Sequence, residues 1–443
     1  DMQGSGQANA FTEIASELTN LQIAWSFLVA GKQFEILVRK FLHPIYRYCE
    51  ARLKSAVVLG LVDDALQVLE SESLPPKNSE YRNILLIAQA SFYSKGDSIR
   101  LDRYDIMIPP ANQENIPRVG SQVKTPEELR SLGIWASLFG YLFGRFVDSQ
   151  AGADHLRQTI QEYRQNEQLW ELAVSLELLG SLNLAVSLNT KQTGNNLEEA
   201  GNALNEALQL FERLGDLREY SYTLLLLGGY HAYLQNWDEA ISKWQEAQAK
   251  FDQIGDTITS LHWLLGDLLF KIGDYDRAFK YYQRIRNKYL QRGQKRIAAY
   301  ALSFESMQAL RYSDIQHARA TREESLLLSQ GVDDEFGEAW STWEMGEIER
   351  VAGNYKESLR WFENARLLFT NVNEGNGLIF YHRGLGDIAL AERAYSQAYA
   401  QFHQSYKHAE NLRFNWGAAY ALAGLGRAES AQQNVEAAVK HLS

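Results

Sequence analysis

The sequence predicts an all-α protein, built as a right-handed superhelix of antiparallel helix pairs. Two observations lead to this prediction. A pattern of small and aromatic residues recurs about every 40 residues, and 7 prolines in 443 residues leave little material for linkers between separate domains. A chain of this length exceeds the usual size of a single hydrophobic core. An elongated array, in which each unit packs on its neighbours, accounts for both observations.

The repeat is marked by an aromatic or large apolar residue at the start of every second helix. Successive markers are 40, 38, 40, 40, 40 and 40 residues apart: Leu197, Trp237, Tyr275, Ile315, Tyr355, Tyr395 and Val435. A glycine stands nine residues before most of the markers from Trp237 on, with Ser306 as the exception, and a small residue follows each marker by three. A fixed period of this length indicates an array of helical hairpins.

Each recurring spacing has a packing reason. Glycine in the first helix and alanine in the second allow two antiparallel helices to approach closely. An aromatic residue four places after the small residue then fills the space between consecutive hairpins: Trp244, Tyr282, Phe362 and Phe402. The Gly-Asp-Tyr and Gly-Asn-Tyr turns supply a glycine for a left-handed cap, followed by Asp274 or Asn354 as an N-cap.

This pattern resembles the tetratricopeptide repeat from about Gly140 to the C-terminus. The common form of that repeat is about 34 residues long, whereas the period here is near 40. We therefore expect each helix to be extended by most of a turn. The predicted repeat superhelix spans residues 126–443.

The chain before the repeats is less regular. Residues 1–14, rich in Gly, Ser and Gln, are expected to be a linker or a cloning remnant, which would make the chain part of a longer polypeptide. Residues 15–104 carry apolar residues at helical spacing and predict an irregular helical region. Residues 105–125 hold 3 of the 7 prolines and predict a long loop, which precedes a helix capped by Thr125.

The segment Glu17–Trp25, with the sequence ELTNLQIAW, carries a second resemblance. It is similar to the start of the helical sensor region in bacterial STAND-type regulatory ATPases of the maltose-regulon-activator kind. Its matching residues are Glu17, Asn20, Leu21, Ala24 and Trp25; Ile23 stands where that family commonly has alanine. The resemblance implies ATPase domains upstream and a repeat superhelix that binds an inducer, either a small molecule or a protein. The alternative role of these residues is helix packing.

Composition argues against several other classes of function. The net charge is −11, with 44 basic and 55 acidic residues and no basic block, which argues against direct binding of nucleic acid. We found neither a membrane-spanning run nor a signal peptide, so a cytoplasmic protein is expected. Cys49 is the only cysteine, which fits a reducing compartment.

Motifs for catalysis are missing from the sequence. It contains no phosphate-binding loop and no H-E-x-x-H zinc motif. His403 and His408 are five residues apart, which is a poor spacing for a pair of metal ligands on one helix. Asp238 and Asp276 recur with the repeat as helix-start residues, where a negative charge is favourable. We therefore expect a protein that is not an enzyme and that has no cofactor and no metal.

What remains is a recognition surface on the first helices of the repeats, which line the concave groove of such a superhelix. The positions expected to face this groove are Trp263, Asp267, Lys271, Tyr300, Arg311, Trp340, Trp343, Glu347, Arg350, Arg383, Asp387, Tyr420 and Arg427. Aromatic and charged groups together suit a peptide or a flat polar molecule. As an alternative, Tyr300, Trp340 and Tyr420 belong to the core between repeats. The charged residues are expected to line a wet groove or to pair between repeats.

Two classes of function therefore stay open. The first is the inducer-binding sensor region of a STAND-type signal-transduction ATPase or transcription regulator. The second is a self-standing tetratricopeptide scaffold that binds a peptide or a helix of a partner protein.

Overall fold

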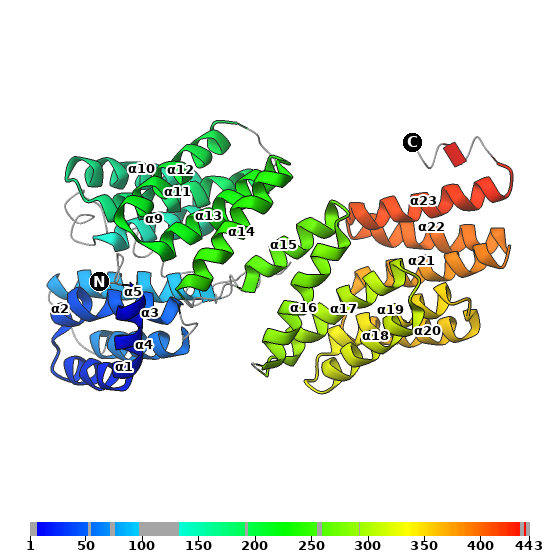
Figure 1. Ribbon diagram of the computed structural model, residues 1–443, viewed down its shortest axis with the longest axis horizontal. Coiled ribbons are helices and arrows are strands. Elements are labelled where there is room, and N and C mark those ends of the chain that lie inside the picture. Colours follow the sequence, from blue (N-terminus) through cyan, green and yellow to red (C-terminus); the bar gives the residue numbers. More distant parts are fainter. Residues whose placement is uncertain are drawn as a thin grey trace. The chain divides into compact units, whose positions relative to one another are not determined.

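The structure is a computed structural model that describes residues 7–51, 55–70, 76–96, 133–190, 194–254, 259–291, 293–434 and 438–439. Every regular element in this part of the chain is helical (Figure 1). The predicted loop 105–125, the helix expected to start at Thr125 and the marker Val435 lie outside the described residues. The chain divides into two compact units, residues 1–261 and 262–443, and this boundary falls inside the predicted repeat array.

The first unit begins with irregular helices that pack around a common apolar core. They are α1 (Gln7–Ala30), α2 (Phe34–Ile36), the π-helix η1 (Leu37–Leu42), α3 (His43–Ala51), α4 (Ser55–Glu70) and α5 (Pro76–Gly96). α1 begins well before residue 15, and Phe11 is fully buried, so residues 7–14 are part of the fold and not a linker. Trp25 of the STAND-like segment is also buried, and its indole nitrogen donates to the Leu61 carbonyl at 2.9 Å. Cys49 is buried as a free thiol.

Helical hairpins follow in the first unit. They are formed by α9 (Ile134–Phe146) with α10 (Ser149–Gln165), α11 (Leu169–Thr190) with α12 (Asn195–Leu214), and α13 (Leu217–Tyr233) with α14 (Trp237–Gln253). The first helices α9, α11 and α13 also contact one another in that order. Residues Leu169–Leu188 of α11 are long and apolar enough to cross a membrane, but two thirds of the segment is buried inside the protein, as in a core helix.

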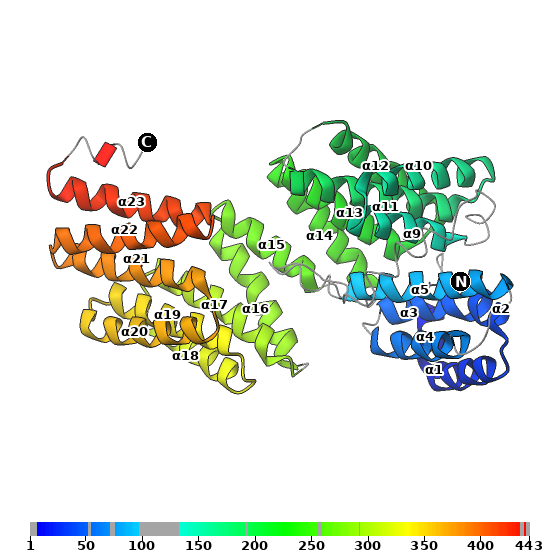
Figure 2. The ribbon, with the colours of Figure 1, turned by 180° about the vertical axis from the view of Figure 1, so that it is seen from behind.

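The second unit is the more regular part of the array. Its helices are α15 (Thr259–Lys271, which contains the unit boundary), α16 (Tyr275–Gln291), α17 (Lys295–Arg311), α18 (Ile315–Gln330), α19 (Glu335–Val351), α20 (Tyr355–Asn371), α21 (Gly375–Ala391), α22 (Tyr395–Asn411) and α23 (Asn415–Ala431). Most of them are 17 residues long, as the extended period predicts. In the stack of hairpins, α17 contacts α19, α19 contacts α21, and α21 contacts α23. Figures 1 and 2 show α21, α22 and α23 side by side in that order.

The repeated glycines lie against the repeated aromatic residues. A Cβ atom added at Gly346 would lie 2.5 Å from the Phe362 ring, and one added at Gly384 would lie 2.6 Å from the same ring. Phe402 is enclosed in the same way by Gly386 and Gly424, at 2.7 and 2.4 Å. Each aromatic ring thus packs between the first helix of its own hairpin and the first helix of the next, which confirms the packing role predicted from the spacing.

The turns follow the predicted chemistry only in part. Gly273 and Gly353 adopt positive φ angles of 88° and 80°, and the Asp274 carboxylate accepts from the backbone of Arg277 at 3.2 Å. Asn354 was expected to cap α20 in the same way, but its side chain makes no capping hydrogen bond. It donates instead to Glu349 at 2.7 Å, because the end of the preceding helix offers a carboxylate within reach.

Candidate functional site

The predicted groove residues all belong to the second unit, and five of them meet in one cluster. We call this group the Arg383 cluster: Trp343, Glu347 and Arg350 of α19, Phe380 and Arg383 of α21, and Tyr420 of α23. The guanidinium carbon of Arg383 lies 5.3 Å from the centroid of the Trp343 ring, 5.1 Å from that of Phe380 and 5.5 Å from that of Tyr420. The cluster is possible because first helices of consecutive hairpins are neighbours, so side chains nearly one or two periods apart in sequence converge.

The charges in the cluster are unevenly paired. Glu347 accepts from Arg350 at 3.2 and 2.9 Å, which is a two-point contact within one helix. Arg383 reaches the same carboxylate only at 3.6 Å, too far for a good hydrogen bond. Glu347 is mostly buried, with 13% of its side chain exposed, and Arg383 is similar at 18%. The contact between Glu347 and Arg383 joins α19 to α21.

Two buried donors of the cluster have no acceptor among the described residues. They are the indole nitrogen of Trp343 and the Nε atom of Arg383. An unsatisfied buried donor costs about 1–3 kcal/mol, so groups of this kind are uncommon in native proteins. Their presence together in one cluster favours a site that is completed by a ligand.

A second pair of groove residues extends the charged row. Arg427 of α23 donates to Asp387 of α21 at 2.7 Å, across one full period of the repeat. The Arg427 guanidinium also lies 5.4 Å from the centroid of the Phe402 ring. Because about half of the Arg427 side chain is exposed, this ion pair contributes little to stability.

The other predicted groove residues are dispersed. Asp267 accepts from the Tyr282 hydroxyl at 2.7 Å, and Trp263 packs against Tyr282 and Phe304. Arg311 lies over the Tyr275 ring at 3.7 Å, and Lys271 is exposed. These residues lie on α15–α17, outside the Arg383 cluster.

The groove aromatics Tyr300, Trp340 and Tyr420 belong only in part to the core between repeats. Tyr300 and Tyr420 are 38% and 42% exposed, so the alternative that they are buried between repeats does not hold. Trp340 does have a packing role: it is half-buried, and its ring lies 5.0 Å from that of Phe369 and 5.3 Å from that of Phe380.

A buried ion pair near this region was missed from the sequence. Arg322 of α18 is fully buried and contacts the Glu344 carboxylate of α19. It also donates to the Ser303 hydroxyl at 2.6 Å and to the Ser303 carbonyl at 3.0 Å. Burial raises the pKa of Glu344, and the Arg322 charge opposes this effect. Arg322 stands four residues after the small residue Ala318, where other repeats have an aromatic ring, so its departure from the repeat pattern was the available signal.

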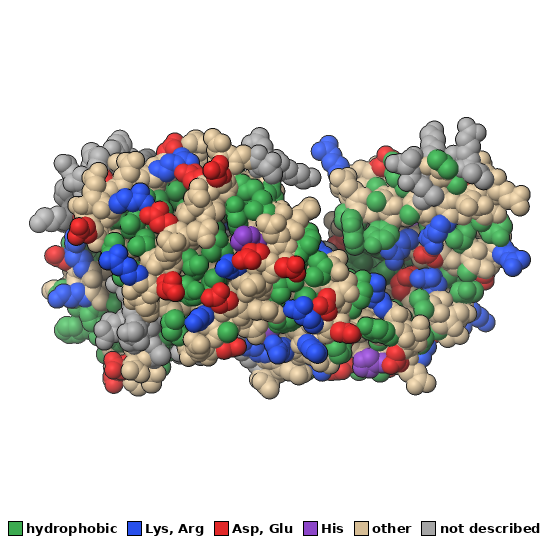
Figure 3. All heavy atoms as spheres, turned by 45° about the horizontal axis from the view of Figure 1, so that its top comes forward, with side chains coloured by type: hydrophobic (Ala, Val, Ile, Leu, Met, Phe, Trp, Pro, Cys, Tyr) green, Lys and Arg blue, Asp and Glu red, His purple; other side chains and the backbone are tan. Residues whose placement is uncertain are grey.

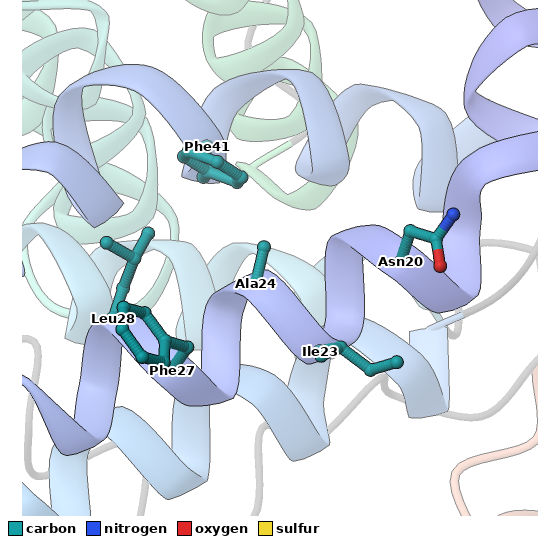
Figure 4. A pocket seen from close by; sticks show the side chains of 6 residues that line it. All are labelled: Asn20, Ile23, Ala24, Phe27, Leu28 and Phe41. Carbon is teal, nitrogen blue, oxygen red and sulfur yellow. The ribbon is translucent and has the colours of Figure 1, made fainter.

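The first unit contains a shallow apolar pocket of about 480 Å³. It is lined by Asn20, Ile23, Ala24, Phe27 and Leu28 of α1 and by Phe41 of η1 (Figure 4). Figure 4 shows Ala24 and Leu28 directed from α1 toward the Phe41 ring. The lining carries one amide and no charge, so it offers little chemistry for specific recognition.

The surface has no dominant sign of charge on the face shown in Figure 3. Acidic and basic side chains are intermixed there with apolar ones. Among the described residues, no group of three or more His, Cys, Asp or Glu side chains is placed to hold a metal ion.

Comparisons with known proteins agree on the fold. No family model matches the chain. Regulatory protein RapG of Bacillus subtilis (strain 168) is 26% identical over 170 residues, which are 38% of this chain and 46% of RapG. The chain therefore spans less than half the length of this curated relative.

Among solved structures, the apo form of RapI has a TM-score of 0.55 at 10% identity, with 92% of this chain and 95% of RapI covered. A STAND protein with a tetratricopeptide repeat sensor from Pyrococcus horikoshii has a TM-score of 0.44 at 13% identity, with 94% of this chain and 71% of that chain covered. The helical hairpins of the structure and the likeness to RapI confirm the predicted all-α repeat fold: the chain has a tetratricopeptide-like helical-repeat fold similar to that of RapI.

Proposed function

We propose that this chain is a non-catalytic sensor module, and that its ligand binds across the first helices of the second unit at the Arg383 cluster. The observation that carries the proposal is the pair of buried donors without acceptors, Trp343 Nε1 and Arg383 Nε, within a cluster of aromatic rings. A ligand with acceptor groups would satisfy both donors. The similarity to RapG, which is described as a regulatory protein, supports a role in regulation.

The finer assignment is the inducer-binding sensor region of a STAND-type regulatory ATPase. It rests on the segment Glu17–Trp25 and on the length of the repeat. In this assignment the cytoplasmic module receives an inducer and transmits its presence to ATPase domains upstream in the full-length protein. The alternative is a scaffold that binds a partner peptide or helix without an attached ATPase.

A thermal-shift screen of metabolites and short peptides tests the sensor proposal. A ligand at a hundredfold its dissociation constant stabilises the folded state by about 2.7 kcal/mol. We expect the stabilisation by a true ligand to be lost in Trp343→Phe and Arg383→Gln and kept in Arg360→Gln. Arg360 is the matched control because it is exposed on α20 and pairs only with Glu357, three residues away, among the described residues. If every stabilising ligand acts equally on all three variants, the Arg383 cluster is not the site.

An assay for nucleotide tests the non-catalytic part. We expect the purified chain neither to bind nor to hydrolyse ATP above background, because it lacks a phosphate-binding loop. Saturable ATP turnover that disappears on substitution of one residue of this chain would contradict the proposal.

A further inference from the structure

The chemistry of the Arg383 cluster also indicates the class of its ligand, an inference that rests on the proposed function. Within the described residues, Arg383 makes no hydrogen bond, and its charged contact is the 3.6 Å approach to Glu347. Glu347 is already engaged by Arg350 through two shorter contacts. The Arg383 guanidinium is therefore the less satisfied of the two cations that share this carboxylate.

The aromatic rings restrict the ways in which a ligand can approach Arg383. Trp343, Phe380 and Tyr420 all have ring centroids within 5.5 Å of its guanidinium carbon. Rings at this distance hold a guanidinium through cation–π contacts and leave its N–H edges as the groups that remain to be paired. The natural partner for such an edge is a planar anion that accepts two parallel hydrogen bonds.

The charge balance favours an anion with a single charge. With the adjacent pair Asp387–Arg427 counted, the three cations Arg350, Arg383 and Arg427 face the two anions Glu347 and Asp387, which leaves a net charge of +1. A carboxylate neutralises this excess. A phosphate group carries about −1.5 to −2 at neutral pH, and it would leave negative charge beside the mostly buried Glu347. The unpaired indole N–H of Trp343 is a further donor for a carboxylate oxygen.

We propose that the Arg383 cluster binds the carboxylate of a peptide ligand. Arg383 forms the main contact, and the Trp343 indole N–H donates to the same group. A peptide is favoured over a small acid because the aromatic column Trp340, Phe380 and Tyr420 continues across α19, α21 and α23. This column provides successive apolar positions for the side chains of an extended chain.

The test uses the whole chain labelled with ¹⁵N, and it follows the indole N–H resonance of Trp343, assigned by its loss in Trp343→Phe. The probes are N-acetyl-Gly-Phe with a free carboxylate and the same dipeptide with a C-terminal amide. We expect the acid to shift the resonance downfield and saturably, because the indole gains an acceptor. The amide is expected to bind at least tenfold more weakly, since it lacks the charge that pairs with Arg383.

Variants separate the carboxylate contact from general packing. Arg383→Gln is expected to lose the response to the acid, and the exposed control Arg360→Gln is expected to keep it. Glu347→Gln removes the competing carboxylate, so we expect it to tighten binding of the acid severalfold without changing that of the amide. Glu347→Gln keeps the test informative if Arg383→Gln is poorly folded.

The outcomes are distinct. Equal responses to acid and amide, a response that persists in Arg383→Gln, or no saturable response at Trp343 would each overturn the carboxylate assignment. The sensor proposal would still stand if the thermal-shift screen found an uncharged ligand that depends on Trp343. Benzoate forms the last arm: if it binds as tightly as the dipeptide acid, the ligand is a small carboxylic acid and the peptide assignment is wrong.

Discussion

Arg322 and Glu344 form a buried ion pair at the positions that Phe362 and Gly384 occupy one period later. In the later repeat the Phe362 ring packs between Gly346 and Gly384. In the earlier repeat the corresponding glycines are replaced by Ser306 and Glu344, and the ring by Arg322. The apolar set Gly-Phe-Gly is thus replaced as a whole by the polar set Ser-Arg-Glu. The helices still pack, and α17 continues without interruption through Ser306. The Ser306 hydroxyl donates to the Ala318 carbonyl at 2.9 Å.

Removing one partner of the Arg322–Glu344 pair should destabilise the folded protein. We expect Arg322→Ala to lower the free energy of unfolding by about 3–5 kcal/mol, because it leaves the Glu344 carboxylate buried without its cation. The measurement is urea unfolding of the wild type and the variant. The control Arg360→Ala should change stability by less than about 0.5 kcal/mol. Equal effects of the two substitutions would show that the Arg322 contact contributes nothing beyond a surface ion pair.

Restoring the apolar set should be tolerated. The triple variant Ser306→Gly, Arg322→Phe and Glu344→Gly copies the surroundings of Phe362. Replacing buried ion pairs with well-packed apolar residues is often neutral or stabilising by about 1–4 kcal/mol. We therefore expect the triple variant to be at least as stable as the wild type by thermal unfolding. A strongly destabilised triple variant would mean that the two repeats do not share the same local packing.

The buried aromatic residues should dominate the stability of the repeats. Phe362 is fully buried, whereas the marker residue Tyr355 is only half-buried. We expect Phe362→Ala to cost about 3–5 kcal/mol and Tyr355→Ala about 1–2 kcal/mol. Thermal or urea unfolding of both variants checks this order. A larger loss for Tyr355→Ala would assign the main packing role to the marker position and not to the residue between the glycines.

The repeat frame could be predicted because packing at these positions depends on residue size, and size recurs in the sequence. Once the period is known, it predicts the packing positions of Gly346 and Phe362. Pairing of charges was harder to foresee, since it depends on side-chain direction across neighbouring helices. The sequence placed Glu347 and Arg383 on one face, but it did not indicate that Arg350 takes the carboxylate and leaves Arg383 poorly paired.

Contacts between distant segments were beyond a single sequence. Arg47 of α3 lies 3.3 Å from Asp216, the N-cap residue of α13, and 2.8 Å from Glu219. Arg47 is separated from Asp216 by 169 residues and from Glu219 by 172, and no repeat relates them. The irregular N-terminal helices are thus joined to the repeats by a buried charge network that has no periodic signal.

Loss of Asp216 should weaken this junction. Its fully buried carboxylate contacts Arg47 and accepts from the Trp170 indole at 3.0 Å. We expect Asp216→Ala to cost about 3–5 kcal/mol, since Arg47 remains buried with one fewer anion. The matched control is Asp148→Ala, which removes a simpler N-cap from α10 and should cost about 1 kcal/mol. Chemical unfolding monitored by circular dichroism compares the two; a similar loss in both would reduce Asp216 to an ordinary helix cap.

The stability of the second unit should fall in mildly acidic solution because of His262 on α15. Burial, followed by the charges of Lys288 and Arg284, lowers the pKa of His262 to about 4 in the folded protein, against an ordinary value of 6.5. The unfolded chain therefore binds a proton more readily than the folded one. The contribution of the neutral imidazole to stability is complete above pH 6.5, and it is lost at about 1.4 kcal/mol per pH unit as the pH falls from 6.5 toward 4.

His262→Leu removes the titrating group at a position where the neighbouring repeat already has Leu302. We expect its unfolding free energy to decline less steeply over this range than that of the wild type, and His317→Leu, at an exposed position, is the control variant. Denaturant unfolding at half-unit steps between pH 7 and pH 4 measures the three slopes, and identical slopes for the wild type and His262→Leu would show that His262 is not the group responsible.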